Sequence, residues 1–415
     1  MTVFRRGRER ATPRGVHVTR REALVGLLAS AGGVAGGVAW ASGDGAELVA
    51  GDAPARAQTV LVAAADASEG LRAQADVVCA GAHDERNINE AVEACGRLGG
   101  IVLLSPGTFT VSGAVRLRSK VTLQGAGRST VLRASGTWAG PDGSEVGSVV
   151  GLHDGATHRT ALRHLSIDGD KEHAVCKGVH YRVDEYPSDA PEGPDPVHVI
   201  DDVHVLNTAS VGVHLTGGTS RSNTVTGVRV FGAGGAEQAE GFLLECYDSF
   251  FAQCESGAAT GDGIRVAGAN NRLTGCKSWY SRRNGFYVEG VRNQFAACES
   301  QDNARHGYIV MAGPNSLVGC HADSNSRPEA GDGPRAEFDG FHMPYAEAVQ
   351  IVGCQAYDRR ESGDASQRHG FYLGEESRDC QIVGIARHNA GDGLAGPGVE
   401  APGMVVSVTG DGRGR

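Results

Sequence analysis

The stretch that decides the fold is G-F-Y-V-E-G-V-R-N-Q-F-A-A-C-E-S, residues 285–300. The same pattern recurs at a spacing of 22 residues in three further stretches: 241–256, 263–278 and 307–322. Each copy carries one cysteine at the same place: Cys254, Cys276, Cys298 and Cys320. A fixed period of this size indicates one structural unit stacked on copies of itself.

Within one copy, apolar Phe286 and Val288 alternate with Tyr287 and Glu289, which is the two-residue period of a half-buried strand. Asn293 then marks a corner, and no part of the copy has a helical period. Strands and tight corners within about 22 residues predict one coil of a parallel β-helix, an all-β solenoid.

Equivalent residues of successive coils are expected to stack in columns, about 4.8 Å apart. The first and third residues after each repeat glycine should point inward: Phe242, Leu244, Ile264, Val266, Phe286, Val288, Tyr308, Val310, Phe341, Met343, Phe371 and Leu373. The four cysteines should form a second inward column, continued in less regular coils by Val203, Val228, Cys354 and Ile385. Four asparagines repeat at one corner, where their side chains can bond to the backbone: Asn223, Asn271, Asn293 and Asn315.

The N-terminal segment predicts export. Thr19-Arg20-Arg21-Glu22-Ala23-Leu24 is similar to a twin-arginine signal, and a weakly apolar run that is too short and glycine-rich for a membrane span follows it. Removing residues 1–57 takes away eight arginines and five acids, which leaves 31 basic and 44 acidic residues and a net charge of −13. This acidic balance argues against nucleic acid as a partner. We expect a secreted or cell-envelope protein that uses the twin-arginine export machinery and does not bind membrane after signal removal.

Ten cysteines in an exported protein raise the question of disulfides. Stacked side chains on parallel strands point the same way, so the column is interpreted as small buried apolar residues. Cys79 and Cys95 are the pair best suited to a bridge. No CxxC or Cys/His cluster indicates a metal site in the sequence.

One amphipathic helix is expected at 84–98, where Ile88, Ala91, Val92 and Cys95 share a face. It precedes G-G-I-V-L-L-S-P-G-T-F (99–109) and V-T-L-Q-G-A-G (121–127). This succession resembles the start of pectate-lyase-like right-handed β-helix proteins. The resemblance implies a single-stranded right-handed parallel β-helix with an N-terminal capping helix.

Four segments follow from this reading. Residues 1–57 are expected to be the twin-arginine signal peptide and linker, and 58–113 the N-terminal linker, cap helix and first strands. Residues 114–396 should form the right-handed parallel β-helix, and 397–415 a C-terminal tail.

The residue before each repeat glycine is the first candidate for catalysis. In polygalacturonase-like members of the superfamily, catalytic Asp and His residues occupy this place in motifs of the form N-T-D-G, G-D-D and G-H-G. Gly261-Asp262-Gly263 is similar to the second motif and Arg305-His306-Gly307 to the third, while Glu240 or Asp339 could stand for the first. The resemblance therefore implies glycoside hydrolysis by Glu240, Asp262 and His306. Gly261 replaces the first Asp of its pair, and Asp or Asn before Gly is also ordinary corner chemistry.

The outward-facing positions that follow the glycines are expected to bind substrate. They hold His180, His214, Glu245, Arg265, Tyr287, Glu289 and His342. The same face supports a second hypothesis, a polysaccharide lyase or uronan epimerase, in which a base removes a proton beside a neutralised carboxylate. Arg265 could neutralise the substrate carboxylate, and His214 or Tyr287 could be the base. Glu245 with Glu289 could hold Ca²⁺. Apart from that calcium ion, no cofactor is expected.

The third hypothesis is a non-catalytic carbohydrate-binding or scaffold solenoid, in which the polar columns do not converge on a cleft. All three hypotheses take a polysaccharide or oligosaccharide as the partner.

Overall fold

The computed structural model describes residues 58–96, 98–138, 146–186, 197–235, 237–328, 336–360 and 364–410. The expected signal peptide at 1–57 lies outside these described residues. Across the described part of the chain, no helix is both long and apolar enough to cross a membrane.

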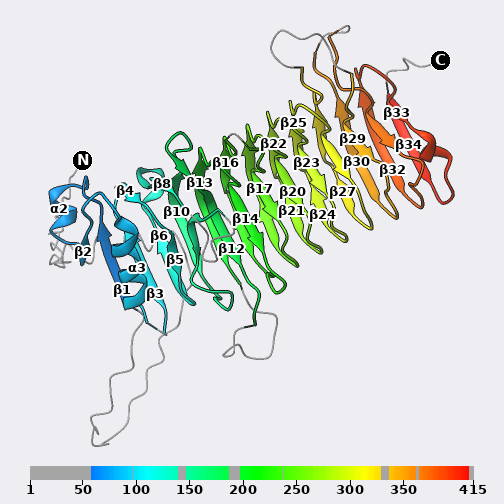
Figure 1. Cartoon of the computed structure of the whole chain (residues 1–415). Coiled ribbons are helices and arrows are strands. Elements are labelled where there is room, and N and C mark those ends of the chain that lie inside the picture. The colour runs from blue at the N-terminus through cyan, green and yellow to red at the C-terminus, as the bar shows by residue number, and fades with distance from the viewer. Residues whose placement is uncertain are drawn as a thin grey trace, which may run out of the picture. The chain divides into compact units, whose positions relative to one another are not determined.

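Each regular coil contains three short parallel strands. In one coil these are β23 (Phe286–Val288), β24 (Gln294–Ala296) and β25 (Glu299–Gln301). β23 belongs to a sheet of 11 strands, here called sheet B, whereas β24 and β25 belong to a sheet of 21 strands, here called sheet A. The strands of successive coils lie side by side along both sheets (Figure 1). The all-β solenoid predicted from the 22-residue period is confirmed.

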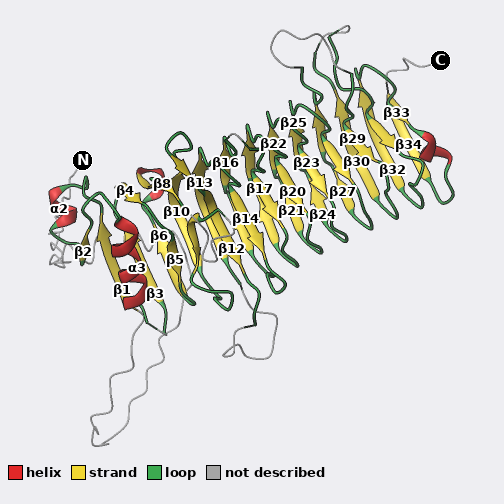
Figure 2. Ribbon diagram, in the orientation of Figure 1, coloured by secondary structure: helices red, strands yellow, loops and turns green. Residues whose placement is uncertain are grey.

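The other strands of sheet B are β5 (Val115–Leu117), β9 (Ser148–Leu152), β12 (Lys177–Arg182), β14 (Val213–Thr216), β17 (Phe242–Leu244), β20 (Ile264–Val266), β26 (Tyr308–Val310), β29 (Phe341–Met343), β31 (Phe371–Leu373) and β33 (Leu394–Ala395). Sheet A begins with β1 (Gln58–Ala63), β2 (Val77–Val78), β3 (Gly100–Leu104), β4 (Gly107–Val111), β6 (Val121–Gln124), β7 (Thr130–Ala134), β10 (Ala161–Asp168) and β13 (Val199–Leu206). It continues, besides β24 and β25, with β15 (Thr224–Thr226), β16 (Arg229–Phe231), β18 (Phe250–Ala252), β19 (Glu255–Gly257), β21 (Arg272–Thr274), β22 (Lys277–Trp279), β27 (Ser316–Val318), β28 (His321–Asp323), β30 (Gln350–Tyr357), β32 (Gln381–Arg387) and β34 (Val405–Gly410). The remaining elements are β8 (Gly136–Thr137), β11 (Ala174–Val175), the helices α2 (Glu69–Arg72) and α3 (Asp84–Ala94), and the 3₁₀ turns η1 (Gly127–Ser129) and η2 (Pro397–Glu400) (Figure 2).

The repeated phrases have direct steric causes. The residue before each column cysteine has a left-handed backbone, as at Gly275 (φ 61°) and Ala297 (φ 51°), and this single residue turns the chain between the two sheet A strands of a coil. The repeat glycine is needed because a Cβ on Gly285 would lie 2.0 Å from Oγ of Ser300. The repeat glycine and the serine two residues after the column cysteine therefore pack against each other.

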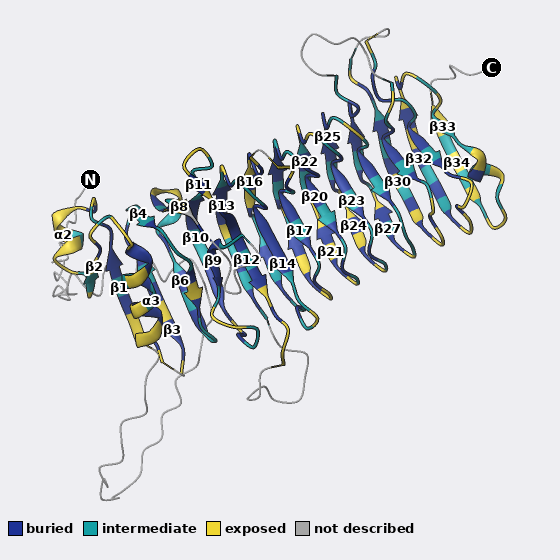
Figure 3. Ribbon diagram, viewed as in Figure 1, coloured by how far each residue is buried: buried dark blue, intermediate teal, exposed yellow. Residues whose placement is uncertain are grey.

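The predicted columns form the interior. The strands of both sheets are coloured largely as buried in Figure 3. All twelve side chains expected to point inward after the repeat glycines are at most 1 % exposed, and the five cysteines from Cys254 to Cys354 are at most 2 % exposed. Four rings stack face to face on successive coils, with centroids 4.7, 4.7 and 5.0 Å apart: Phe286, Tyr308, Phe341 and Phe371. Burial of these aligned side chains supplies the main stabilisation of a coil.

Buried amides close the corners. The backbone N–H of Asn271 donates to Oδ1 of Asn293 (2.9 Å), and the side chain of Asn293 donates to the carbonyl of Gly268 (3.0 Å). Asn315 repeats the arrangement one coil on, so the predicted asparagine corner is confirmed for Asn271, Asn293 and Asn315. Asn223 differs, because its side-chain amide donates to the hydroxyls of Ser220 and Ser249 instead of to backbone. A second ladder runs along another corner through Asn303, Asn325, Gln367 and Asn389.

Helix α3 caps the first coil through polar contacts as well as its apolar face. Ile88, Ala91 and Val92 are buried, while the carboxylate of Asp84 accepts the backbone N–H of Thr110 (2.9 Å) and Asn89 accepts that of Arg116 (2.8 Å). Strand N–H groups at the open end of the solenoid are thereby satisfied, as capping requires.

Some sequence expectations need correction. Ile385 is 39 % exposed, because Gly384 pairs with Cys354 and takes the inward position, so placing Ile385 in the cysteine column was wrong. A Cys79–Cys95 bridge was also wrong, since both thiols are free, and Sγ of Cys95 donates to the carbonyl of Ala91 in its own helix.

The solenoid also extends beyond the expected boundaries. β1, β3 and β4 precede residue 114 and pair within sheet A, and β34 follows residue 396 and pairs with β32.

Candidate functional site

The outer face of sheet B carries a row of side chains, most of them polar or aromatic, one from each of the eight strands from β12 to β31. Parallel pairing places them in register, for example Arg265 beside Tyr287 and His342 beside Tyr372. The row is His180, His214, Leu243, Arg265, Tyr287, Ile309, His342 and Tyr372. Leu243 and Ile309 divide it into three groups.

The first, here the lysine–histidine group, consists of Lys177, His180, His214 and Glu245. The rings of His180 and His214 stack with centroids 4.4 Å apart, Nζ of Lys177 lies 3.3 Å from Nδ1 of His214, and Nε2 of His214 lies 2.8 Å from Glu245. Burial, followed by the positive charge of its neighbours, lowers the pKa of His180 to about 3. His180 is therefore neutral at ordinary pH.

The second, here the arginine group, consists of Glu240, Arg265, Tyr287 and Glu289. Arg265 donates to both carboxylate oxygens of Glu289 (3.0 Å), lies 3.6 Å from Glu240, and holds its guanidinium 5.4 Å from the ring centre of Tyr287. Burial opposes its charge, but the hydrogen bonds to Glu289 raise the pKa of Arg265 overall. Two carboxylates thus already neutralise the arginine.

Asp262 lies beneath this face rather than on it. Asp262 is 1 % exposed, and its Oδ1 accepts hydrogen bonds from the backbone N–H (2.9 Å) and the side-chain amide (2.8 Å) of Asn284 on the next coil. The backbone N–H of His306 in turn donates to Oδ1 of Asn284 (3.2 Å). The column before the repeat glycines is thus a corner ladder, and His306 lies two coils beyond Asp262, about 10 Å along the stack.

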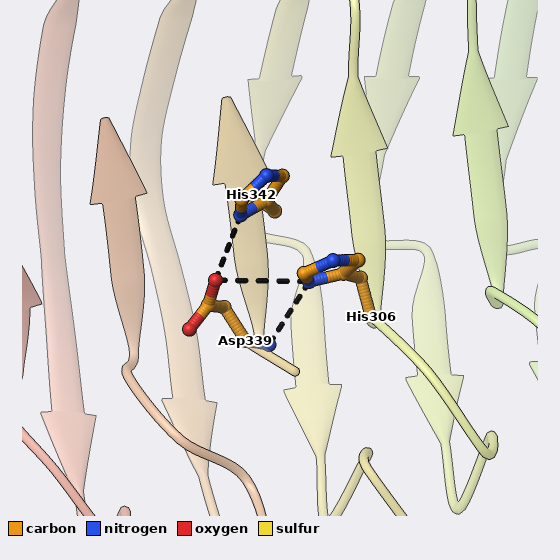
Figure 4. A group of neighbouring side chains, drawn as sticks. All are labelled: His306, Asp339 and His342. Carbon is orange, nitrogen blue, oxygen red and sulfur yellow. Dashed lines mark hydrogen bonds and ion pairs between the residues drawn. The ribbon is translucent and has the colours of Figure 1, made fainter. Parts of the chain in front are cut away.

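The third, here the histidine–aspartate group, consists of His306, Asp339, His342, Arg368 and Tyr372. Nδ1 of His342 donates to Oδ2 of Asp339 (2.7 Å) (Figure 4). The ring of His342 stacks between those of His306 (centroids 4.1 Å apart) and Tyr372 (4.9 Å). Arg368 donates to both oxygens of the fully buried Asp339 (2.8 and 2.7 Å). These contacts hold the imidazole of His342 in one orientation and one tautomer.

The charges of this group are well defined. Burial opposes ionisation of Asp339, but hydrogen bonds from Arg368 and His342 lower its pKa to about 2. Burial and the neighbouring His342 lower the pKa of His306 to about 3, and Nδ1 of His306 accepts the backbone N–H of Asp339 (3.0 Å). Asp339 is therefore an anion and His306 a neutral ring.

The group offers polar atoms to a ligand. Among the described residues, neither Nε2 of His342 nor Nη1 of Arg368 has a hydrogen-bond partner. The side chains are 16 % and 34 % exposed. The group presents a hydrogen-bond acceptor and a cationic donor on one face, next to the hydroxyl-bearing ring of Tyr372.

His306, Asp339 and His342 also have ligand atoms within 4.8 Å of one another, a spacing that suits a metal ion. However, Asp339 already binds Arg368 with both oxygens, and Nδ1 of His306 already accepts a backbone N–H. A cation at this place would have to displace or face the guanidinium, so the arrangement suits proton transfer better than metal binding.

The sequence reasoning identified most side chains of this face but grouped them differently. It put Glu240, Asp262 and His306 into one centre, whereas only Glu240 contacts the arginine group, and His306 belongs with His342. It overlooked Arg368, which follows Asp339 by 29 residues in coils that depart from the 22-residue period. The Asp-x-x-His spacing of Asp339 and His342, which starts at a repeat corner, was the available signal.

A comparison with family models finds one match, to the right handed beta helix region, over residues 197–398. The match spans just under half of the chain and agrees with the solenoid architecture of the two sheets. Among solved structures, the HK620 tailspike of an Escherichia coli bacteriophage is similar, with a TM-score of 0.55 and 12 % identity over 80 % of this chain and 63 % of the tailspike.

Geobacillus virus E2 ORF18 has a TM-score of 0.51 and 16 % identity, covering 76 % of this chain and 58 % of that protein. The mannuronan C-5 epimerase AlgE4 A-module of Azotobacter vinelandii has a TM-score of 0.50 and 15 % identity, covering 80 % and 97 %. No curated protein matches the chain in sequence. Identities this low establish the shared fold and leave the activity to the site itself.

Proposed function

We propose that the protein is an exported polysaccharide lyase that acts on uronic acid residues, with His342 as the base. The observation that carries this proposal is the 2.7 Å contact between Nδ1 of His342 and the ionised Asp339. A carboxylate in this position orients the ring, keeps the lone pair on Nε2, and stabilises the imidazolium that forms after proton transfer.

The reaction needs three further events: binding of the substrate carboxylate, cleavage of the glycosidic bond and protonation of the departing oxygen. Nη1 of Arg368 binds the substrate carboxylate and stabilises the negative charge that develops when Nε2 of His342 removes the proton on the adjacent carbon. The electron pair forms a carbon–carbon double bond while the bond to the glycosidic oxygen breaks. The hydroxyl of Tyr372, whose ring lies 4.9 Å from that of His342, donates a proton to the departing oxygen.

The arrangement favours elimination over the two related reactions. His342 and Tyr372 project from the same face of sheet B on neighbouring strands, so proton removal and proton donation occur on one side of the sugar. Epimerisation needs a proton from the opposite side. Hydrolysis by Glu240 and Asp262 would need both carboxylates at the surface, and Asp262 is 1 % exposed.

The proposed reaction takes its positive charge from Arg368 and needs no calcium ion. The carboxylates considered for calcium, Glu245 and Glu289, accept hydrogen bonds from His214 and Arg265 respectively. Assays with added Ca²⁺ and with a chelator should therefore give equal rates.

The test is activity on polygalacturonate, alginate and a neutral control, dextran. Unsaturated products that absorb in the ultraviolet are expected from an acidic polysaccharide, and His342→Gln should lower the rate by about 10²–10⁴-fold. His321→Gln, on the outer face of sheet A, is the matched control and should retain activity. Reducing ends without ultraviolet absorbance, inverted uronates detected by NMR, or full activity of His342→Gln would each overturn the proposal.

Export rests on the Arg20-Arg21 signal, which lies outside the described residues. We expect the chain to leave the cytoplasm through the twin-arginine route and Arg20→Lys/Arg21→Lys to retain it inside. Fractionation of cells that express both forms provides the measurement.

A further inference from the structure

Sheet A carries an exposed aromatic patch on its outer face, separate from the row on sheet B. The patch consists of Phe231 at the end of β16, Trp279 at the end of β22, and Tyr280 directly after it. Phe231 and Tyr280 are 43 % and 42 % exposed, and Trp279 is partly exposed. The ring centroids of Phe231 and Trp279 lie 5.6 Å apart, and those of Trp279 and Tyr280 lie 5.5 Å apart.

Gly257 makes this patch continuous. Phe231, Gly257 and Trp279 occupy the same position on three successive coils, so the two rings belong to strands that do not pair directly. A Cβ at residue 257 would lie 2.8 Å from both rings, which shows that they close over the glycine. The absence of a side chain on the middle coil thus lets two aromatic rings meet.

Hydrogen-bonding groups surround the rings and hold them in place. Nε1 of Trp279 donates to Glu255 (2.7 Å), which fixes the orientation of the indole. Gln301 follows Trp279 in the same column and accepts a hydrogen bond from Lys277 (2.6 Å). The guanidinium of Arg327 lies 5.0 Å from the ring centre of Tyr280. Carboxylate, amide, ammonium and guanidinium groups therefore lie beside an apolar aromatic surface.

We propose that this aromatic patch is a second carbohydrate-binding surface. A pyranose ring has an apolar C–H face, which stacks on an aromatic ring, and a rim of hydroxyls, which bind to charged and amide groups. The patch offers both kinds of group, and its ring positions are fixed before binding, which lowers the entropic cost of association.

The size of the patch favours a sugar over a second copy of the chain. Phe231 and Tyr280, with side chains of about 200 Å² each, are somewhat less than half exposed, and with the smaller exposed part of Trp279 the patch presents about 200 Å². A stable protein interface needs about 800 Å² on each partner. The largest apolar patch on a typical monomer is about 300–600 Å² and is often functional, so a patch of this size suits a small ligand better than a protein partner. The surface does not depend on the chemistry at His342, and it would hold a polysaccharide while another part of the molecule acts on it.

The experiment is native electrophoresis of the full chain through gels that contain polygalacturonate, alginate, dextran or soluble chitin oligosaccharides. His342→Gln serves as the background, so that turnover does not remove the ligand. We expect retardation in at least one gel, and Trp279→Ala should weaken it about tenfold. Tyr280→Ala should act in the same direction and serves as the second variant if Trp279→Ala folds poorly.

Phe250→Ala is the matched control, because Phe250 is 48 % exposed on sheet A and lies outside the patch. Gly257→Ala should weaken binding by separating the rings without removing either one. Equal retardation of the Trp279→Ala/His342→Gln and His342→Gln proteins would overturn the proposal. No retardation of His342→Gln in any of the four gels would also overturn it. So would a concentration-dependent dimer in sedimentation that Trp279→Ala abolishes, because the patch would then bind a second copy.

The two proposals can fail separately. Loss of product formation in His342→Gln with unchanged retardation supports the sheet B chemistry alone. Trp279→Ala in the otherwise unaltered protein should retain its rate on short oligosaccharides, which do not reach from one face to the other. A loss of rate on these short substrates would show that the aromatic patch is not a separate surface.

Discussion

Replacing Tyr308 with Phe should stabilise the protein. Tyr308 is fully buried in the ring stack between Phe286 and Phe341, and within the described residues its hydroxyl has no hydrogen-bond partner. Leaving a buried hydroxyl unpaired costs about 1–3 kcal/mol. The substitution removes that cost, keeps the stacked ring, and leaves a void the size of one oxygen atom, so we expect a gain of about 1–2 kcal/mol.

The assay is urea unfolding followed by circular dichroism, or unfolding rates at matched urea concentrations if refolding is slow. Phe286→Tyr is the reciprocal change, since it adds a hydroxyl to the same stack and should destabilise the protein by a similar amount. Equal or lower stability of Tyr308→Phe would refute the reasoning, because it would mean that the hydroxyl is satisfied in the native protein.

Two more outcomes follow from the buried polar groups. Asn293→Ala leaves the N–H of Asn271 and the carbonyl of Gly268 without their partner, so we expect the free energy of unfolding in urea to fall by about 2–5 kcal/mol. Gln294→Ala, at the exposed neighbouring position, should lower it by less than about 0.5 kcal/mol. Similar losses for both variants would contradict the ladder. The pKa of His306 and of His180 is about 3 in the folded protein and near 6.5 in the unfolded chain. Between these values the unfolded chain binds more protons, so the free energy of unfolding should fall as the pH decreases, by up to about 4 kcal/mol per histidine. A midpoint of urea unfolding that stays constant from pH 7 to 4 would contradict this.

The regular coils could be predicted because one period fixes every column. Once Cys276 and Cys298 are aligned, the position of Phe286, Asn293 and Ser300 follows from strand alternation alone. Prediction failed where the period is interrupted. Ile385 was placed by counting along the chain, but the register shifts between Val352 and Cys354, and a glycine takes the inward place.

The candidate site was only partly predictable for a related reason. Outward positions on straight strands, such as Arg265 and His342, follow from the period, whereas residues at the corners do not. Asp262 precedes a strand, where alternation does not determine the side-chain direction, and its carboxylate binds the next coil instead of facing solvent. Arg368 reaches Asp339 across a coil of 30 residues, so its contact depends on loop geometry that the repeat does not encode.

The in-register stacking of the 22-residue coils has a consequence for how such a molecule changes over generations. Duplicating one complete winding between the arginine group and the histidine–aspartate group would join every column to its own continuation and create no mismatch. The single alteration would be a separation longer by about 4.8 Å. The number of windings therefore sets the distance between these two groups, and recombination within the gene can change that distance by one winding at a time.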